Sequence, residues 1–460
     1  MTASSLGFGC KRQDARCRNF QLITYNLKLE TFILESYYNY MGEEPHLKKL
    51  FILPLVLMAL VLNAGILFPV DAREKATAKD KLITERKQKA IVPKPVDRYA
   101  IGCVLPLTGR YAASGNRALE AIILASGVFD PAVKSPFKLI IEDSKSKPET
   151  ARAAVTKLTV QDGVLCILGP LGNTEAIDAA REAQKLKIPI ITLTQKEKIT
   201  DIGNYVFRNY MTNHMQIRRL VTYAIEDMDI SRFAVLYPDD PYGREMERLF
   251  RDEVLRQGGE IRGAKFYDKT KTDFGDEIKA ITRIKETSSE GKEYRNNKDE
   301  YKPVIDFDAL FIPDSPERIS MILPQLAFHN IRGIKLLGAG SWNSPVLLKA
   351  GGEYLEGAIF IDGFSRNSFY PETNDFIDIF YTNYSREPDV IEALVYDATN
   401  IIIKTIEDDD IKTRDQFRDG MLRLKNYRGV TGKTSFAGAR DVQKEAFVLM
   451  VKDGQVMQIK

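Results

Sequence analysis

Polar residues stand directly after several apolar, strand-like runs of this sequence. The clearest case is the segment 169–174, Gly-Pro-Leu-Gly-Asn-Thr, which ends one apolar run and begins a helical one. Gly172 lets a ligand approach the backbone, while Asn173 and Thr174 are good helix-capping residues. Free N–H groups and the helix dipole at such a terminus favour a carboxylate. The segment therefore predicts an anion-binding loop, with ordinary capping and no ligand as the alternative.

Other candidate ligand contacts follow further strand-like runs and share polar or aromatic side chains. They are Ser114, Thr194, Gln195, Tyr242, Asp314, Ser315 and Trp342. In an open parallel α/β sheet, ligands bind beyond the carboxyl ends of the strands, which is where these loops would lie. Trp342 is the single tryptophan, and it either stacks on a ligand or fills the base of a cleft.

Catalytic and metal-binding patterns are missing from the sequence. His214 and His329 lie in separate helical stretches, and neither HExxH nor GxSxG occurs. The glycine-containing run 429–434 has Tyr427 where a phosphate loop needs its first glycine. The acidic run 407–410 lacks the spacing of a calcium loop. We therefore expect no enzyme activity, no cofactor and no metal.

The composition is that of an ordinary globular protein. The 460 residues include 66 Lys+Arg and 63 Asp+Glu, a formal charge of +3, with 44% hydrophobic residues. This composition excludes disordered and multi-span membrane classes, and the lack of a basic excess argues against a nucleic-acid partner. Four cysteines argue against a disulfide scaffold. Cys103 and Cys166 lie in apolar runs, which favours buried free thiols over a bond between neighbouring strands.

An uncharged stretch near the N-terminus indicates export. Residues 50–67 carry no charge, follow Lys48 and Lys49, and are succeeded by the small residues Val70 and Ala72. A basic region, an apolar region and a small-residue cleavage site together are typical of a secretory signal. The alternative is an uncleaved anchor that contacts the membrane only through residues 50–70.

The position of this signal suggests a later start of translation. Met41 would give a short basic region before the apolar one, so we interpret 1–40 as a spurious or disordered extension. Residues 41–72 are then the signal peptide or anchor, and 73–97, rich in Lys, Glu and Ala, form a linker. Both alternatives place the remaining chain in the periplasm.

From residue 98 onwards, strand-like and helix-like segments alternate. Strands separated by helices predict parallel sheets covered on both faces. The alternation restarts near residue 232, which predicts two Rossmann-like α/β lobes joined by a multi-strand hinge. The boundaries that we expect are 98–212 for lobe 1, 213–363 for lobe 2, 364–428 for helices returning to lobe 1, and 429–460 for C-terminal strands of lobe 2. An Asp-Gly turn at 453–454 predicts a hairpin there.

Several motifs together resemble a known family. The run 101–115, Ile-Gly-Cys-Val-Leu-Pro-Leu-Thr-Gly-Arg-Tyr-Ala-Ala-Ser-Gly, resembles the opening of type 1 periplasmic binding proteins of the leucine/isoleucine/valine-binding group. Further similar segments, in the same order, are 168–170, 188–194, 205–208, 234–237 and 393–398. The resemblance covers essentially all of 98–460 and implies the periplasmic binding protein-like I fold. It is strongest to a bacterial subgroup described either as branched-chain amino-acid transport proteins or as penicillin-binding-protein activators.

The resemblance also implies roles for particular residues. In amino-acid binders of this family the ligand carboxylate is held by the loop matching 169–174 and by the loop matching Thr194 and Gln195. Tyr242 resembles the aromatic lid residue. Only Asp314 is available for the ligand ammonium, Ser114 stands where an aromatic is common, and Gln195 replaces a small residue. These departures disfavour a free amino acid and leave another small polar molecule, or no ligand, as alternatives.

Two functions follow from the resemblance. The first is a solute-binding protein that closes on a small polar ligand, an amino acid or related carboxylate, and delivers it to the permease of an ABC transporter. The alternative is a cell-envelope interaction protein that activates a penicillin-binding protein, a peptidoglycan synthase, without transport. The retained cleft loops favour the first function, and the incomplete ammonium site favours the second.

Overall fold

A computed structural model describes residues 93–282, 304–408 and 410–460. All of these residues belong to one unit, residues 90–460. The sequence predictions for 1–40, for 41–72 and for most of the linker 73–97 lie outside the described residues. Within the described ranges, none of the helices combines the length and the apolar character needed to cross a membrane.

The first sheet contains five parallel strands in the order β2-β1-β3-β4-β5. Their bounds are β1 (Asp97–Leu105), β2 (Lys138–Asp143), β3 (Val164–Leu168), β4 (Ile190–Thr192) and β5 (Val206–Arg208). Every residue of β3 is buried, because helices cover both faces of the sheet. This is why the strand reads as an uninterrupted apolar run rather than an alternating one.

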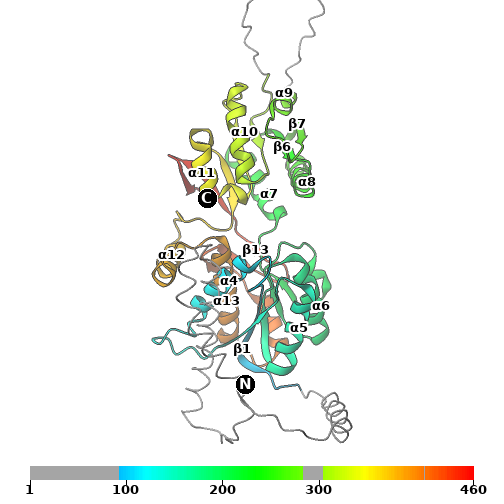
Figure 1. Cartoon of the computed structure of the whole chain (residues 1–460), viewed down its shortest axis with the longest axis vertical. Coiled ribbons are helices and arrows are strands. Elements are labelled where there is room, and N and C mark those ends of the chain that lie inside the picture. Colours follow the sequence, from blue (N-terminus) through cyan, green and yellow to red (C-terminus); the bar gives the residue numbers. More distant parts are fainter. Residues whose placement is uncertain (1–92, 283–303, 409) are drawn as a thin grey trace, which may run out of the picture. The chain divides into compact units, whose positions relative to one another are not determined.

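Five helices pack on this sheet, and two of them come from far along the chain (Figure 1). The bounds are α4 (Ala112–Ser126), α5 (Pro148–Lys157), α6 (Asn173–Leu186), α13 (Val390–Asp408) and α14 (Arg414–Arg423). Side chains of α4, α13 and α14 share one hydrophobic cluster with β1 and β3. Side chains of α5 and α6 share another cluster with the opposite face. The segment after residue 389 therefore returns to the first sheet.

The second sheet has seven strands in the order β15-β14-β10-β9-β8-β6-β7. Their bounds are β6 (Arg232–Pro238), β7 (Glu260–Tyr267), β8 (Ala309–Phe311), β9 (Lys335–Gly338), β10 (Ile359–Asp362), β14 (Phe447–Lys452) and β15 (Gln455–Gln458). The first five are parallel, while β14 and β15 are antiparallel. Asp453 and Gly454 both have positive φ, as a tight hairpin turn requires, so the predicted hairpin is confirmed.

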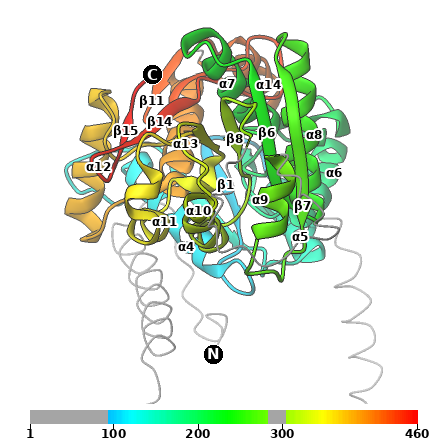
Figure 2. The ribbon, with the colours of Figure 1, turned by 90° about the horizontal axis from the view of Figure 1, so that it is seen from above.

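Helices cover both faces of the second sheet as well. The bounds are α7 (Asn213–Thr222), α8 (Pro241–Arg256), α9 (Gly275–Ile281), α10 (Pro316–Phe328) and α11 (Pro345–Gly351). Side chains of α7 and α8 form one cluster with the sheet, and those of α9, α10 and α11 form the other. Figure 2 shows α8 running beside β6, with α10 on the other side of the sheet. The two-lobed α/β fold class predicted from the sequence is confirmed.

The remaining helical elements of the described residues are one longer helix and five short ones. They are α12 (Pro371–Tyr384), η1 (Leu158–Asp162), η2 (Ile199–Ile202), η3 (Tyr223–Asp227), η4 (Gly340–Trp342) and η5 (Gly352–Leu355). A third sheet is made of β11 (Tyr427–Gly429), β12 (Gly432–Ser435) and β13 (Gln443–Lys444). The sequence assigns 429–460 to lobe 2, but only β14 and β15 join the second sheet. The small third sheet is instead bridged to Arg208 of β5 through Asp441.

The chain passes at three places between the second sheet and the side of the molecule that holds the first and third sheets. The first crossing, 209–212, follows β5, the second, 363–370, follows β10, and the third, 445–446, lies between β13 and β14. Three connections of this kind permit a rotation of one lobe against the other and restrict independent movement. They are the multi-strand hinge that the sequence predicts.

Cys103 and Cys166 occupy adjacent strands of the first sheet. Cys103 lies in β1 and Cys166 in β3, and both are buried, free thiols. Burial raises the pKa of Cys103 to about 12. The prediction of buried thiols is confirmed, and both side chains act as small core hydrophobes.

Candidate functional site

A cavity of about 300 Å³ lies where the three crossings meet. The first crossing contributes Tyr210 and Met211, the second contributes Gly363 directly after Asp362, and Lys444 immediately precedes the third. The other lining residues are Gln195, Asn213, Gln216, Tyr242, Gly340, Ser341, Val390, Leu394 and Thr431. Residues from both lobes and from the third sheet therefore share one space.

Two of the residues predicted as ligand contacts line this cavity, Gln195 and Tyr242. The side-chain amide of Gln195 donates a hydrogen bond to the hydroxyl of Tyr210 at 2.9 Å. Tyr242 is the second residue of α8. Asp240 caps the start of this helix, because the carboxylate of Asp240 accepts a hydrogen bond from the N–H of Gly243 at 2.8 Å. The sequence rule that loops after parallel strands meet at a ligand site therefore located part of the lining.

The anion-binding loop predicted at the start of α6 is not among the lining residues. Asn173 and Thr174 are exposed, and Thr194 is buried. The hydroxyl of Thr194 donates to the side-chain oxygen of Asn173 at 2.5 Å, so these two polar groups already bond to each other. Gly172 precedes the first helical residue. Ser114, in the first turn of α4, does not line the cavity either.

Asp314, Ser315 and Trp342 also lie away from the cavity lining. Asp314 accepts from the hydroxyl of Tyr267 at 2.5 Å and pairs with Arg318 at 3.2 Å, so its charge is partnered within lobe 2. Ser315 precedes the first residue of α10. Trp342 is 1% exposed, and its indole N–H donates to the carbonyl of Ile312 at 2.9 Å. Of the two alternatives for Trp342, the structure therefore favours packing below the cleft.

Asp362 is a cavity residue that the sequence did not single out. It ends β10 and is 7% exposed. Its two carboxylate oxygens accept from the N–H of Gly363 at 2.6 Å and from the side-chain amide of Asn343 at 2.8 Å. Burial raises the pKa of Asp362 to about 7, because neither neutral donor replaces the lost hydration. An acidic residue at the end of an apolar strand was the only signal that could have found it.

Lys444 is the second residue that sequence reasoning missed. Its ammonium donates to the hydroxyls of Thr431 at 2.6 Å and Thr434 at 3.0 Å. Thr431 in turn donates to Asp397, which is buried and also accepts from the backbone N–H groups of Thr431 and Val430. Loss of hydration lowers the pKa of Lys444 to about 8, and the negative charge of Asp397 opposes this shift.

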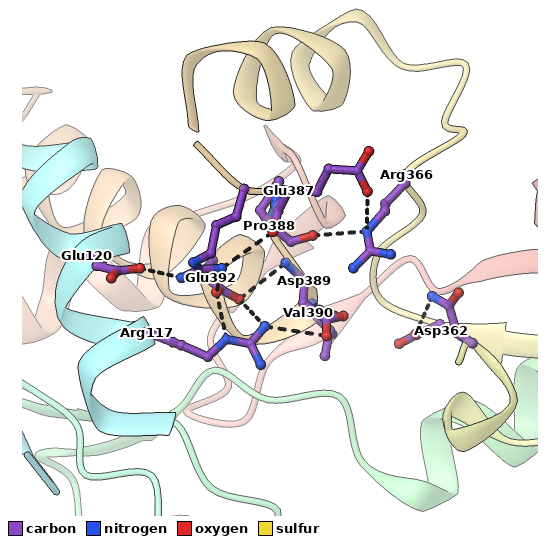
Figure 3. A network of polar contacts seen from close by, with 11 residues as sticks. Arg117, Glu120, Asp362, Arg366, Glu387, Pro388, Asp389, Val390 and Glu392 are labelled. Atoms are coloured by element: carbon purple, nitrogen blue, oxygen red, sulfur yellow. Dashed lines mark hydrogen bonds and ion pairs between the residues drawn. The ribbon is translucent and has the colours of Figure 1, made fainter. Parts of the chain in front are cut away.

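A network of charged residues holds the start of α13 against α4 (Figure 3). Glu392 is fully buried and accepts two hydrogen bonds of 2.6 Å from Arg117 and one of 2.7 Å from Arg386. Arg386 also pairs with Glu120 of α4. This network fixes the first turns of α13, from which Val390 and Leu394 line the cavity.

The same network reaches the second crossing. The guanidinium of Arg366 donates to the carbonyl of Pro388 at 3.1 Å and pairs with Glu387 at 3.4 Å. Figure 3 shows Asp362 outside this network, with the start of α13 between it and Arg117. The second crossing, which begins next to Asp362, is therefore tied to the helix that lines the cavity.

The lining suits a small organic molecule. It combines amide, hydroxyl, carboxylate and ammonium groups with the apolar side chains of Met211, Val390 and Leu394. Over the part of the chain that the structure describes, no group of three or more His, Cys, Asp or Glu side chains gathers as metal ligands would.

Two α/β lobes, three crossings and a polar cavity at the hinge define a two-lobed binding protein of the type 1 class. The family model described as periplasmic binding protein matches residues 98–455, and the chain belongs to this family. The family consists of solute-binding proteins that act outside the cytoplasm. The resemblance predicted from the motifs is confirmed.

Solved structures show the same fold. A putative branched-chain amino acid ABC transporter protein from Rhodospirillum rubrum is 22% identical, with a TM-score of 0.69, over 80% of this chain and 100% of its own. The branched-chain amino acid transporter substrate-binding protein LivJ from Streptococcus pneumoniae, solved with isoleucine, is 23% identical, with a TM-score of 0.57, over 80% of this chain and 100% of its own.

A third structure carries a different ligand. It is a solute-binding protein of an ABC transporter from Rhodopseudomonas palustris BisB5, solved with 3,4-dihydroxybenzoic acid. It is 20% identical, with a TM-score of 0.58, over 78% of this chain and 96% of its own. The comparison with curated proteins finds no match.

Proposed function

We propose that this chain is a periplasmic solute-binding protein that closes on a small polar molecule, an amino acid or a related carboxylate, and delivers it to the permease of an ABC transporter. The observation that carries the proposal is the cavity itself. The first two crossings contribute to its wall and the third begins directly after Lys444, so a bound solute lies against or next to the segments that must bend during closure.

The chemistry of the lining supports binding rather than catalysis. A hydrolytic triad needs a nucleophile beside a histidine, and the lining residues of this cavity include no histidine. Gln195 and Tyr242 are the contacts that we retain from the sequence analysis. The helix start at residues 172–174 becomes a less favoured contact, because Asn173 already bonds to Thr194.

The comparisons favour transport over the alternative of activating a peptidoglycan synthase. The three solved structures reported above are titled as transporter or solute-binding proteins, and two of them hold small carboxylate-bearing ligands. The polar cavity points in the same direction, because an interaction protein without a ligand has no need of it.

Thermal unfolding of the full chain against a library of amino acids and small carboxylates tests the proposal. We expect at least one compound to raise the Tm, because a ligand that binds only the folded state stabilises it. Gln195→Ala should reduce this shift, whereas Thr174→Ala, the matched control at the α6 start, should leave it intact. If no compound raises the Tm and the chain instead copurifies with a cell-wall synthase, the transport function is wrong.

A further inference from the structure

Two opposite charges line the cavity, and neither makes a direct ion pair with another described residue. Lys444 and Asp362 both belong to the lining, and within the described ranges neither forms an ion pair. Charged groups withdrawn from water are costly unless paired and fully hydrogen-bonded. A bound molecule with an anionic and a cationic group can therefore supply the ion-pair partner that each of these charges lacks.

The ammonium of Lys444 has a donor to spare. An ammonium carries three N–H groups, and the hydroxyls of Thr431 and Thr434 accept two of them. The hydroxyl hydrogen of Thr431 is directed to Asp397, so its oxygen can only accept from Lys444. Asp397 itself is engaged by two backbone N–H groups and this hydroxyl. The third N–H of Lys444 has no acceptor among the described residues.

The carboxylate of Asp362 has acceptor capacity to spare. Two carboxylate oxygens offer about four acceptor sites, and of the residues that the structure describes only Gly363 and Asn343 donate to them. Both donors are neutral, so the negative charge is not compensated. A cationic donor in the cavity would form the stronger, charge-assisted type of hydrogen bond.

The fold places both groups at the hinge. Asp362 lies opposite Phe447 in the antiparallel pair of β10 and β14, and Lys444 precedes Phe447 by three residues. Both charges therefore flank the third crossing, where the chain enters the second sheet. Both side chains line the same cavity of about 300 Å³, which is at the small end of ligand sites, so a molecule that fills it contacts both.

We propose that one small zwitterionic solute binds in this cavity, with its anionic group at Lys444 and its cationic group at Asp362. Residues at the hinge then recognise both charges of the solute. This inference rests on the proposed function, because it requires a solute in this cavity. It assigns the anion to a lysine of the third sheet rather than to the start of α6. It also supplies the ammonium contact that Asp314, held by Tyr267 and Arg318, does not provide.

The wild-type full chain gives the first test. The twenty standard L-amino acids are screened by Tm shift, and the best one is compared by calorimetry with its deaminated carboxylate and its decarboxylated amine. We expect the zwitterion to bind at least about tenfold more tightly than either analogue, because each analogue leaves one of the two charges unpaired. An analogue that binds as tightly as the amino acid would overturn the inference.

Four variants give the second test. Lys444→Met should weaken binding of the amino acid and of the deaminated carboxylate by about tenfold or more, and leave the amine unchanged. Asp362→Asn should weaken the binding of the amino acid and of the decarboxylated amine, and leave the binding of the deaminated carboxylate unchanged. Lys433→Met, in neighbouring β12 with its ammonium exposed beside Glu445, is the matched control and should change nothing. General damage to the fold would weaken the binding of all three probes equally. Lys444→Arg should restore the binding of the deaminated carboxylate.

The outcomes separate the two proposals. If an amino acid binds but Lys444→Met keeps its full affinity, the charge assignment is overturned and the binding function stands. If another class of compound binds and no amino acid does, the assignment of a zwitterionic solute is likewise overturned. If nothing in either library binds, the solute-binding function fails and the assignment fails with it.

Discussion

Arg117 of α4 and Glu392 of α13 form two parallel hydrogen bonds, each 2.6 Å long, across 275 positions of sequence. The bonds join a helix near the start of lobe 1 to the helix that returns to it after the second crossing. Bidentate pairs of this kind combine charge with fixed geometry. The first turns of α13, which line the cavity, are held by this contact.

Glu392→Gln should lower the free energy of unfolding by roughly 3–5 kcal/mol, because it removes the one anion shared by Arg117 and Arg386 in a buried site. Urea unfolding measures the change. Glu387→Gln is the control, since that side chain is 59% exposed and should cost less than about 1 kcal/mol. Equal effects for the two variants would contradict the structural importance of the buried pair.

Asp362 should make the fold less stable as the pH rises. Its pKa is about 7 in the folded chain and near 4 when unfolded, so between these values only the folded state holds the proton. The free energy of unfolding therefore falls through this window. Relative to wild type, Asp362→Asn should gain up to roughly 4 kcal/mol between about pH 4 and about pH 8.

The control for this pH dependence is Asp308→Asn. The pKa of Asp308 is lowered by its hydrogen bond with Arg232, so that carboxylate stabilises the fold above its unfolded pKa and loses its effect in acid. Its variant should approach the wild type as the pH falls towards 3, the opposite trend to that of Asp362→Asn. A parallel trend for both variants would show that the burial of Asp362 is not the cause.

Gly429→Ala should destabilise the third sheet, because a Cβ at this position would lie 2.3 Å from the carboxylate oxygen Oδ1 of Asp397. Asp397 is held by three hydrogen bonds and cannot retreat without losing them, so we expect a cost of about 1–3 kcal/mol. Gly263→Ala in β7 is the matched control, since its nearest neighbour would be at 3.5 Å. Thermal unfolding compares the two, and a larger loss in the control would be contrary to this packing.

Trp342 should behave as a core fluorophore. It is the single tryptophan and is 1% exposed, so acrylamide should quench its fluorescence weakly in the native protein and strongly in urea. Solutes that raise the Tm should change its emission only slightly, because the ring packs below the cleft and not on its lining. Strong native quenching, relieved by a solute, would instead place the ring at the ligand.

The alternation of apolar runs and helical segments was enough to predict two parallel α/β lobes, because strands covered on both faces must be apolar throughout. The same regularity pointed to strand-end loops, and Gln195 and Tyr242 do line the cavity. This regularity could not predict that Asp314 accepts a hydrogen bond from Tyr267, which lies 47 residues earlier in the chain. A local pattern carries no information on a partner so distant in sequence.

The sequence by itself determined the fold class, the family and the location of strand ends, since each follows from short-range periodicity or motif order. Only the tertiary structure decided which charges face the cavity. Asp362 and Lys444 come from different sheets, and each is placed by long-range pairing, of β10 with β14 and of β12 with β13. Burial sets the free-energy cost of those two charges and therefore their part in ligand binding. It arises only once the three crossings have brought the sheets together.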